Sequence, residues 1–571
     1  MNKKIICLFA LLAVFGLVFS PAVFSQVPSG QTAGGVAQQE KSIAVERQLQ
    51  KKIETPRPKP EGEIEEEAIP EDKGPKVLIK KIKVEGVTLL PQKQVDSVVS
   101  GFEGKELSMS AMQKVADLVT DEYRKNGYVT SRAYLPPQTV EKGTLLIRVV
   151  EGKLGKLEIQ GNRFFKTSLL KKKINIPAGS SFNYSSLQKS LTYINEHPDR
   201  TAKAVLSPGE APGTTDILVD VKDRLPIHAG IEYDNYGSRY IGRNRGTLFI
   251  EDNNLLGFDD RAYIRVQRTE SSHLKMMTGG YISPLGNTIK LGAYGFQSKT
   301  RLGKEFEDLD ARGKANIWGL FYNQDLVDTE NVDIAFHAGF DYKNIKNYLL
   351  GEENSEDDLR IFKAGVDFDV SDKWGRTIIT SELDAGLPNF WGSMSSHDSH
   401  SSRSGYGGKF FKGVFNIFRL QPMPFSSDIL FKNTAQFTND VLVASEQFQI
   451  GGATSVRGYS PAEQVGDKGI YSSVEWSFPP YFVPKSLGLP LTKEKVYDTV
   501  RIVGFFDWAT AHSNKTLAGE KKHQTLKGAG VGVRLNVKDN VSFRIEFGYP
   551  IGKTPSDGKN VRPWIETVIK F

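Results

Sequence analysis

From about residue 225 to its end, the chain alternates between hydrophobic and polar residues with a period of two. The clearest run is 540–549, in which one face carries Val541, Phe543, Ile545, Phe547 and Tyr549. The runs 332–343 and 362–370 follow the same pattern. A period of two predicts β-strands that present one apolar and one polar face.

Three features favour a membrane barrel over a soluble β-sandwich, which also alternates. The segment 225–571 shows no helical periodicity, and its connections alternate between tight turns such as 283–287 and polar loops such as 393–406. The chain ends on Phe571, which shares a face with Ile569. Because every backbone polar group must pair in lipid, strands that span a membrane close into a barrel. At roughly 20 residues per strand and connection, the segment predicts about 16 antiparallel strands, within a range of about 14 to 18.

Two similar units precede this segment, at residues 76–152 and 153–224. The strand-like run 82–86 ends in a glycine, and the run 157–161 repeats it 75 residues later. Each run is followed by two helical patterns and then by two strand-like runs. In the first unit the helical patterns are at 92–99 and 108–125 and the strand-like runs at 129–135 and 144–150. In the second unit the helical patterns are at 168–173 and 184–195 and the strand-like runs at 202–206 and 216–221. The order β-α-α-β-β predicts two small α/β domains, each with one sheet covered by two helices.

The first 25 residues have the pattern of a secretory signal peptide. Lys3 and Lys4 precede an apolar run at 5–19, and Val23 and Ser25 are small enough for a cleavage site. We therefore expect an exported protein.

Residues 26–75 separate this leader from the first α/β unit. A short helix is expected at about 41–54, because Val45, Leu49 and Ile53 are spaced four apart on one face. The rest is rich in proline and glutamate and is expected to be an extended linker.

Composition narrows the classes of function. The chain has 571 residues, of which 25% are charged, and its mean hydropathy of −0.35 excludes a polytopic helical membrane protein. The net charge of +7 is modest for this length and gives little support to nucleic-acid binding. The single cysteine, Cys7, lies in the expected leader, so the mature chain has no thiol for a disulfide, a metal site or a nucleophile.

Motifs of enzymes are incomplete in this sequence. Gly552-Lys-Thr554 resembles the end of a phosphate-binding loop, but the position that needs glycine is Phe547. His397 and His400 lie in a serine-rich run, which favours an exposed loop over a metal site. We expect no catalytic residue, no cofactor and no metal.

One glycine-rich loop between strand-like runs stands out, at 451–459. It contains Arg457, and 50 residues later Asp507 lies within a strand, on the face opposite Phe506. If Asp507 faces the lumen, its carboxylate is able to hold the loop inside the barrel through the planar guanidinium of Arg457. Removing either partner would then cost about 3–5 kcal/mol if the pair is shielded from water, and under about 1 kcal/mol if it is hydrated.

Together these segments resemble a known family. Val456, Arg457, Gly458 and Tyr459 match the VRGY signature of the outer-membrane superfamily of protein insertases and two-partner secretion transporters, and Phe505 and Asp507 match its F-x-D strand motif. The runs 123–128, 151–152, 197–200 and 208–209 are similar to those of its POTRA domains. With a leader, an N-terminal helix, a linker, two POTRA-like units and a barrel, the chain resembles the two-partner secretion transporters of the haemolysin secretion/activation type.

The resemblance implies a 16-stranded outer-membrane barrel of a Gram-negative bacterium, with the VRGY loop folded into the pore and the N-terminal helix plugging it. The implied partner is a large exoprotein that arrives unfolded in the periplasm and is bound by the POTRA domains. Outer-membrane lipid and the barrel assembly machinery are further expected partners, with Phe571 as the C-terminal assembly signal.

Three other functions compete with export. An insertase for outer-membrane barrels is disfavoured by having only two POTRA-like units and a plug helix. A passive porin leaves about 150 residues before the barrel without a role. An outer-membrane enzyme lacks a credible nucleophile.

Overall fold

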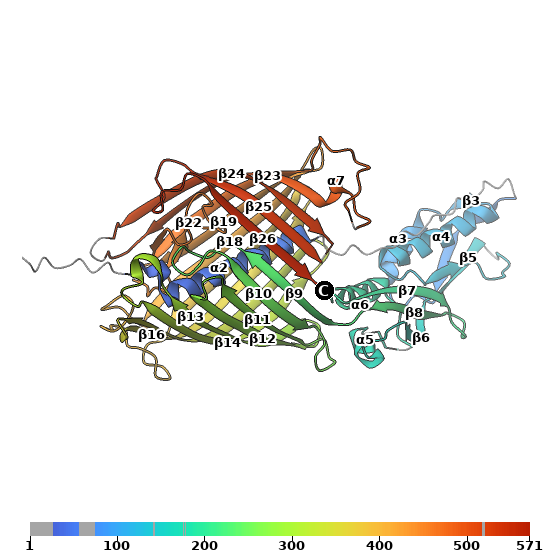
Figure 1. Ribbon diagram of the computed structural model, residues 1–571. Helices are drawn as coiled ribbons and strands as arrows, with labels where there is room; N and C mark the ends of the chain where they lie inside the picture. Colours follow the sequence, from blue (N-terminus) through green and yellow to red (C-terminus); the bar gives the residue numbers. More distant parts are fainter. Residues whose placement is uncertain are drawn as a thin grey trace, which may run out of the picture.

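The computed structural model describes residues 27–55, 75–140, 143–174, 176–177, 179–490, 492–516, 520–538 and 540–571. The expected signal peptide lies outside the described residues, and so does nearly all of the expected linker. The described chain forms two α/β domains, a barrel next to them, and a helix that lies inside the barrel (Figure 1).

Sixteen antiparallel strands close the barrel, and its first strand pairs with its last. This confirms the count expected from length and the antiparallel order. The strands are β9 (Ile227–Asp234), β10 (Arg245–Asp252), β11 (Arg261–Thr269), β12 (Leu274–Leu285), β13 (Ile289–Arg301), β14 (Arg312–Asp328), β15 (Val332–Leu349), β16 (Glu352–Asp372), β17 (Gly375–Gly386), β18 (Phe410–Met423), β19 (Ser427–Thr438), β22 (Lys468–Phe478), β23 (Val500–His512), β24 (His523–Val537), β25 (Val541–Pro550) and β26 (Arg562–Lys570).

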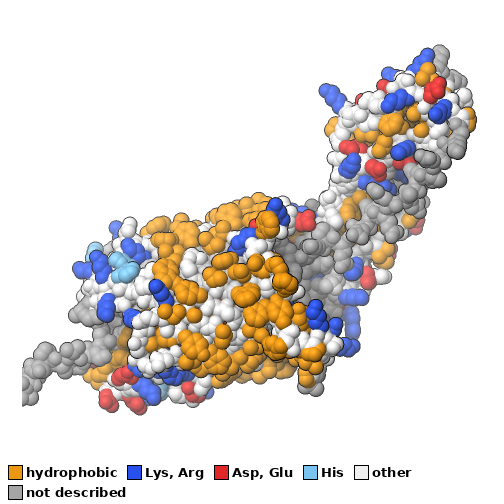
Figure 2. All heavy atoms as spheres, turned by 90° about the horizontal axis from the view of Figure 1, so that it is seen from above, with side chains coloured by type: hydrophobic (Ala, Val, Ile, Leu, Met, Phe, Trp, Pro, Cys, Tyr) orange, Lys and Arg blue, Asp and Glu red, His pale blue; other side chains and the backbone are white. Residues whose placement is uncertain are grey.

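The alternation of the sequence corresponds to the two faces of the barrel wall. On β25, Phe547 and Tyr549 are exposed on the outside, whereas Glu546 and Gly548 are buried on the inside. Figure 2 shows hydrophobic side chains spread over the wall, with most charged side chains gathered towards the ends. A wall that is apolar outside and polar inside is the arrangement of a barrel in a membrane.

The connection between β19 and β22 folds into the barrel. It carries two short strands, β20 (Phe448–Ile450) and β21 (Gln464–Gly466), which pair with each other. We call residues 439–467 the infolded loop. It enters from the end of the barrel that lies away from the α/β domains, the distal end; the opposite end is the proximal end.

Helix α2 (Ala33–Glu54) occupies the lumen, preceded by the short 3-10 helix η1 (Ser29–Gln31). Leu49 and Ile53 of the expected stripe pack against the wall. The expected start near residue 41 is wrong, because the helix begins eight residues earlier. Gly34 and Gly35 disfavour a helix on their own, but here Gly34 lies so close to the infolded loop that a Cβ would come within 3.0 Å of the Ser445 backbone nitrogen. Tertiary packing therefore extends the helix.

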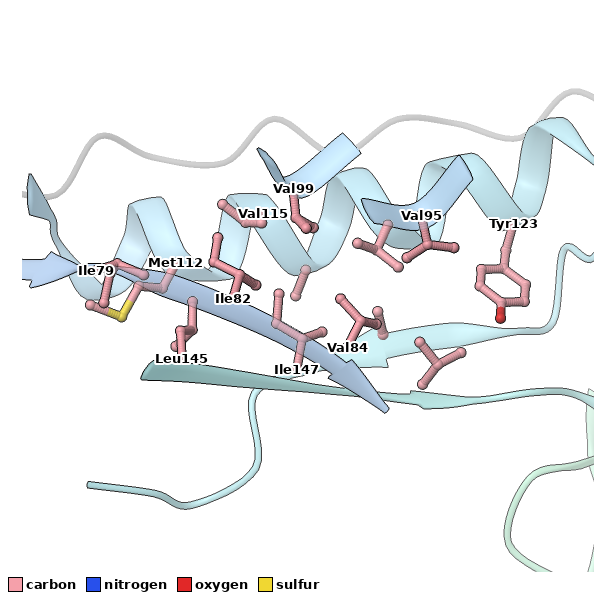
Figure 3. Close-up of a cluster of buried hydrophobic side chains, with 14 of the residues drawn as sticks. Ile79, Ile82, Val84, Val95, Val99, Met112, Val115, Tyr123, Leu145 and Ile147 are labelled. Carbon is pink, nitrogen blue, oxygen red and sulfur yellow. The ribbon is translucent and has the colours of Figure 1, made fainter. Parts of the chain in front are cut away.

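The first α/β domain has the expected core of two helices on one sheet (Figure 3). Side chains of α3 and α4 pack against Ile82, Val84, Leu145 and Ile147 of the sheet. Strands β1 and β3 pair with each other as an additional small sheet that the sequence pattern did not predict. The elements are β1 (Val77–Ile79), β2 (Lys81–Glu85), α3 (Gln92–Ser100), β3 (Lys105–Leu107), α4 (Met109–Lys125), β4 (Arg132–Tyr134) and β5 (Thr144–Val150).

The second α/β domain repeats the topology and leads directly into the barrel. Its sheet has the order β6-β8-β7, with β6 and β8 parallel, as β2 and β5 are in the first domain. Its elements are β6 (Lys153–Gln160), α5 (Thr167–Lys173), α6 (Tyr184–Asn195), β7 (Arg200–Pro208) and β8 (Thr214–Asp223). Within the described ranges, no helix is long and apolar enough to cross a membrane.

Candidate functional site

The tip of the infolded loop is held in the lumen by its own apolar side chains. Val456 and Tyr459 are completely buried and pack with Phe448, Ile450, Tyr471, Ala509, Ala511 and Leu526. The Tyr459 hydroxyl donates a hydrogen bond to the Lys553 carbonyl oxygen over 2.8 Å. The two bulky residues of the VRGY signature are therefore anchors of the loop.

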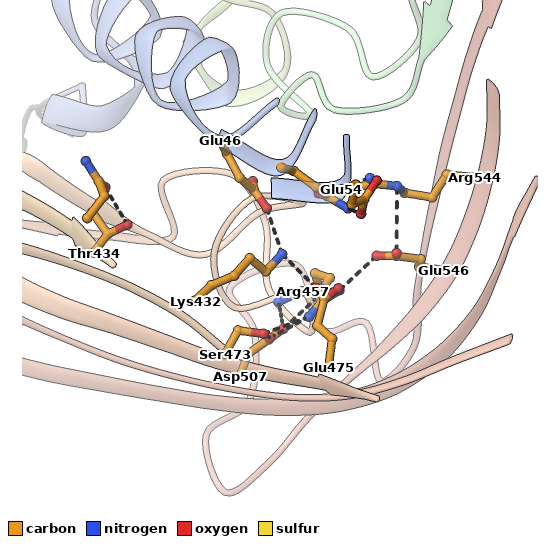
Figure 4. A network of polar contacts seen from close by, with 12 residues as sticks. Glu46, Glu54, Lys432, Thr434, Arg457, Ser473, Glu475, Asp507, Arg544 and Glu546 are labelled. Carbon is orange, nitrogen blue, oxygen red and sulfur yellow. Dashed lines mark hydrogen bonds and ion pairs between the residues drawn. The ribbon is translucent and has the colours of Figure 1, made fainter. Parts of the chain in front are cut away.

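Between these anchors, Arg457 engages the F-x-D motif on β23 (Figure 4). Its Nε and Nη2 donate to the two carboxylate oxygens of Asp507 over 2.9 and 2.7 Å, and its backbone nitrogen also donates to Asp507. The guanidinium lies 3.4 Å from the centre of the Phe505 ring. Both named residues of the motif thus contact one arginine, by a bidentate ion pair and by a cation–π contact.

Glycines allow the loop to approach the wall closely. A Cβ on Gly458 would lie 2.6 Å from the Pro550 backbone nitrogen, and a Cβ on Gly548 would clash with the Arg457 carbonyl oxygen. Trp564 of β26 donates its indole N–H to the same carbonyl over 2.8 Å. Close backbone approach therefore accounts for the glycine of the signature.

The sequence analysis missed most of the ionic network around Arg457. Its Nη1 also lies 2.9 Å from Glu475 and 3.0 Å from Glu546. Arg534 pairs with both of these acids, and all of these side chains are at least nine-tenths buried. The available signal was the alternation itself, which places Glu475 and Glu546 on inward positions of β22 and β25.

This network reaches helix α2. Lys432 lies 2.7 Å from Glu475 and 2.8 Å from Glu46 of the helix (Figure 4). The chain of ion pairs from Arg457 through Glu475 and Lys432 to Glu46 therefore joins the infolded loop to the helix inside the lumen.

Further charged contacts hold α2 along its length. Lys41 pairs with Glu382 at 3.0 Å, and Lys52 pairs with Asp369 at 3.2 Å. Glu40 pairs with Arg245. Arg47 is shared among three acids, Glu232 and Asp234 of β9 and Glu566 of β26.

The loop also binds η1 and the amino-terminal part of α2 directly. Gln449 donates to the Gly35 carbonyl oxygen over 2.7 Å, and Gln31 donates to the Pro461 carbonyl oxygen over 3.2 Å. At the other end, Arg376 of the wall donates to the Thr55 carbonyl oxygen over 2.5 Å. The helix thus runs from the distal to the proximal end of the lumen.

The remaining residues singled out from the sequence lie apart from this network. Phe571 follows the last residue of β26; its backbone nitrogen donates to Ala229 over 2.8 Å and its ring is exposed. His397 and His400 lie in the distal connection between β17 and β18. Across the described parts of the chain, no three His, Cys, Asp or Glu side chains are grouped as metal ligands.

The run 197–200 joins the second α/β domain to the barrel. Asp199 accepts hydrogen bonds from Arg224, His228 and Asn253 at 2.6–2.8 Å. Arg200 forms a bidentate pair with Asp259, in the turn between β10 and β11, at 2.5 and 2.7 Å. The domain is therefore fixed to the first strands of the barrel by buried charges.

Comparison with known families decides what this assembly is. The family model described as "Haemolysin secretion/activation protein ShlB/FhaC/HecB" matches residues 213–535. The chain belongs to this family. A second model, the ShlB-type POTRA domain, matches residues 77–152.

Curated relatives agree with the haemolysin secretion/activation family. The heme/hemopexin transporter protein HuxB of Haemophilus influenzae is 22% identical over 489 residues, covering 83% of each chain. The outer membrane transporter CdiB of Escherichia coli O6:K15:H31 is 25% identical over 493 residues, covering 84% of this chain and 79% of that protein. The solved structure of CdiB from Escherichia coli superposes with a TM-score of 0.73 at 22% identity, covering 96% of this chain and all of that one.

Membership assigns the protein to the outer-membrane transporters of two-partner secretion rather than to the insertases. The barrel spans the outer membrane and the POTRA domains lie in the periplasm, so the proximal end is the periplasmic end. We call the two α/β domains POTRA 1 and POTRA 2. Transporters of this family work with a secreted partner exoprotein, and they are not enzymes.

The POTRA 2 junction yields a first prediction. Arg200 and Asp259 expose only 0% and 7% of their side chains, and Asp259 also lies 2.8 Å from Lys173, so Arg200→Ala should destabilise the junction by about 1–3 kcal/mol. Spin labels at Lys171→Cys in POTRA 2 and Asn331→Cys on the barrel should then report a broadened distance distribution by pulsed electron resonance. Replacement of the exposed Lys222 by alanine is the matched control, and unchanged distances in Arg200→Ala would refute the prediction.

The pH dependence of this junction follows from its carboxylates and one histidine. Burial alone would raise the pKa of Asp199 and of Asp259, but hydrogen bonds and ion pairs with Asn253, Arg224 and Arg200 hold both pKa values below their usual range. Groups with a lowered pKa contribute their full stabilisation above the pKa of the unfolded chain, about 3.9, and lose it as the pH falls further. The contribution of these carboxylates should therefore stay constant between about pH 5 and 8. Burial lowers the pKa of His197 in the same junction, so the distance distribution should broaden as the pH falls below about 6.5, where the unfolded histidine takes up a proton.

Proposed function

We propose that the protein exports one large, unfolded partner exoprotein from the periplasm to the cell surface through its own lumen. Helix α2 is the resting plug of this pore, and the infolded loop is its gate. The observation that carries the proposal is that α2 fills the lumen and is held there by ion pairs at Lys41, Glu46, Arg47 and Lys52, as well as by apolar packing against the wall. Contacts of this kind are reversible, so the same lumen is able to close and to open.

Most wall residues that bind the plug keep a second partner when it leaves. Asp369 remains 2.8 Å from Arg376, and Lys432 remains paired with Glu475. Glu232 keeps Arg265, and Asp234 keeps Arg245. Because an unpaired charge in a low-dielectric site is costly, this arrangement lowers the free energy needed to withdraw α2.

The periplasmic domains offer a site for an extended chain. In POTRA 2, β7 pairs with β8 on one side only, and no described strand pairs with its other edge. Val205 on this nine-residue strand is more than half exposed. Strand addition at such an edge gives affinity through backbone hydrogen bonds with little demand on sequence, which suits a long unfolded substrate. Folding of the exoprotein outside the cell would then make its passage directional.

The arginine of the gate has no chemical role in this proposal. Arg457 and Asp507 set the conformation of the infolded loop, and Val456, Gly458, Tyr459 and Phe505 support it. Neither a cofactor nor nucleic acid takes part. Insertion of the barrel itself is assigned to the barrel assembly machinery, with Phe571 as part of the signal.

Deletion of the gene in its host tests the proposed function. We expect one or a few large proteins to disappear from the culture supernatant by mass spectrometry, while the profile of outer-membrane proteins stays unchanged. A copy of the wild-type gene should restore them, and a copy lacking residues 76–224 should not. A broad fall in outer-membrane barrels would refute export as the primary function and support assembly of other barrels instead.

A further inference from the structure

The periplasmic rim carries one long connection among short ones. Residues 479–499, between β22 and β23, include the short helix α7 (Val496–Thr499), whereas the other described periplasmic connections have between two and eight residues. The connection is ordered by its own backbone hydrogen bonds, from Leu489 to Glu494 and from Val496 to Leu487. We call it the rim loop. The described backbone of this loop is therefore held by internal hydrogen bonds.

Several large apolar side chains of the rim loop are exposed. Phe482 is 81% exposed, and Tyr481 and Leu487 are each half exposed. The Tyr481 hydroxyl donates over 2.7 Å to the carbonyl oxygen of Phe425, which lies in the neighbouring turn and is itself 85% exposed. Trp374, in the next turn along the rim, is 63% exposed, and its carbonyl oxygen accepts a hydrogen bond from Gln421. Three neighbouring connections thus each expose an aromatic side chain, and we call them together the aromatic rim.

Backbone geometry does not explain why an aromatic residue, Phe425, lies at the tip of the turn between β18 and β19. Phe425 has a φ of +63° and the following Ser426 a φ of +57°. Glycine or asparagine adopts this region with less strain than a bulky residue. Backbone conformation therefore gives no reason for an aromatic residue at this exposed position.

The aromatic rim is continuous with the lipid-facing wall. Trp476 and Phe478 lie on the outer face of β22, with ring centres 5.0 Å apart, and Phe478 stacks on Tyr481 at 5.8 Å with nearly parallel planes. Lysines accompany the rings: the ammonium of Lys373 lies 5.0 Å from the Trp374 ring. Aromatic rings next to basic side chains at the end of an apolar wall fit the interface of a bilayer, where the rings enter the lipid and the ammonium groups meet phosphates.

We infer that the rim loop, together with Trp374 and Phe425, is an interfacial anchor that inserts into the periplasmic leaflet of the outer membrane. Its partner is a phospholipid surface. The loop joins β22 and β23, which supply Glu475 and Asp507 to the gate network. The anchor therefore fixes to the membrane the part of the wall that holds Arg457.

Site-specific labelling tests the anchor in the intact transporter. A single cysteine at Phe482→Cys, in a Cys7→Ser chain, would carry a bimane fluorophore in vesicles of phosphatidylethanolamine and phosphatidylglycerol. Lipids with a nitroxide near the headgroup should reduce its emission about twofold more than that of a label at Asn331→Cys, an exposed position in the polar periplasmic turn between β14 and β15. Iodide in the water should show the opposite order.

Further measurements distinguish a membrane from other possible binding partners of the rim loop. A label at Trp374→Cys should behave like the label at position 482, and heat-dependent migration on a gel checks that each variant has folded. Equal quenching by iodide at positions 482 and 331, with no effect of lipid nitroxides, would overturn the inference. A label at position 482 that responds to added exoprotein and not to nitroxide lipids would overturn it as well, because the rim would then be a substrate site.

Discussion

Replacing Arg457 by alanine is expected to stop export while the barrel still inserts into the outer membrane. Without the guanidinium, Asp507, Glu475 and Glu546 remain buried together, with Arg534, Arg544 and Lys432 left to balance them. Loss of one partner from such a shielded set costs about 3–5 kcal/mol, enough to release the loop from the wall. Secreted exoprotein in the supernatant, normalised to the amount of folded barrel, measures the effect.

Two controls separate the gate from general stability. Arg360 is also buried, pairs with Asp358 at 2.8 Å and lies 3.6 Å from the centre of the Tyr342 ring, but it does not contact the infolded loop. Arg360→Ala should lower thermal stability and leave export nearly intact. In a double-mutant cycle, Arg457→Ala and Asp507→Ala together should lose little more export than either alone. Additive losses would show that the two residues act independently.

Reversing the charge of Arg47 should open the resting pore. In Arg47→Glu the helix would place a fourth acid among Glu232, Asp234 and Glu566. Because Arg47 is about one-third exposed, solvent screens part of the repulsion, and we expect the plugged state to be destabilised by about 1–3 kcal/mol. This change in free energy raises the ratio of open to plugged pores about 5- to 150-fold. Planar bilayer recordings of the purified protein should show this as an increased open probability.

The same helix supplies the matched control for this experiment. Lys51 lies one turn further along α2 and is exposed. Lys51→Glu makes the same change in net charge without placing a carboxylate between β9 and β26, so its recordings should match those of the wild type. Equal opening in both variants would mean that overall charge, rather than the three acids around Arg47, keeps the plug in place.

The alternation of side chains between the two faces of a strand explains why part of the gate could be predicted from the sequence. A period of two places Asp507 on the face opposite Phe506, and a spacing of two brings Phe505 to the same side. The partners Glu475, Glu546 and Arg534 were hidden because inward positions of such a barrel carry many charges. Which of them meet depends on the pairing of residues that lie up to 44 positions apart in the sequence, as Lys468 and His512 do, and alternation within one strand does not encode that register.

Other features were hidden because tertiary contacts override local preference. Helix propensity argues against a start at Ala33, since two glycines follow it, yet the infolded loop and the wall stabilise that turn. The rim loop contains several prolines and alternates poorly, so the sequence pattern gave no reason to assign its aromatics to a membrane surface. Their common position became apparent only from three turns that lie side by side.

The direction of α2 in the lumen bears on how the pore closes after each export event. The helix is about 33 Å long at 1.5 Å per residue, and its carboxyl end, near Arg376, faces the periplasm and the chain that leads to POTRA 1. If α2 withdraws as proposed, it stays covalently joined to POTRA 1 through the chain between Thr55 and Pro75. Its return is then a unimolecular step at an effective concentration in the millimolar range. On the proposed mechanism, this covalent connection allows the same helix to close the pore again after export.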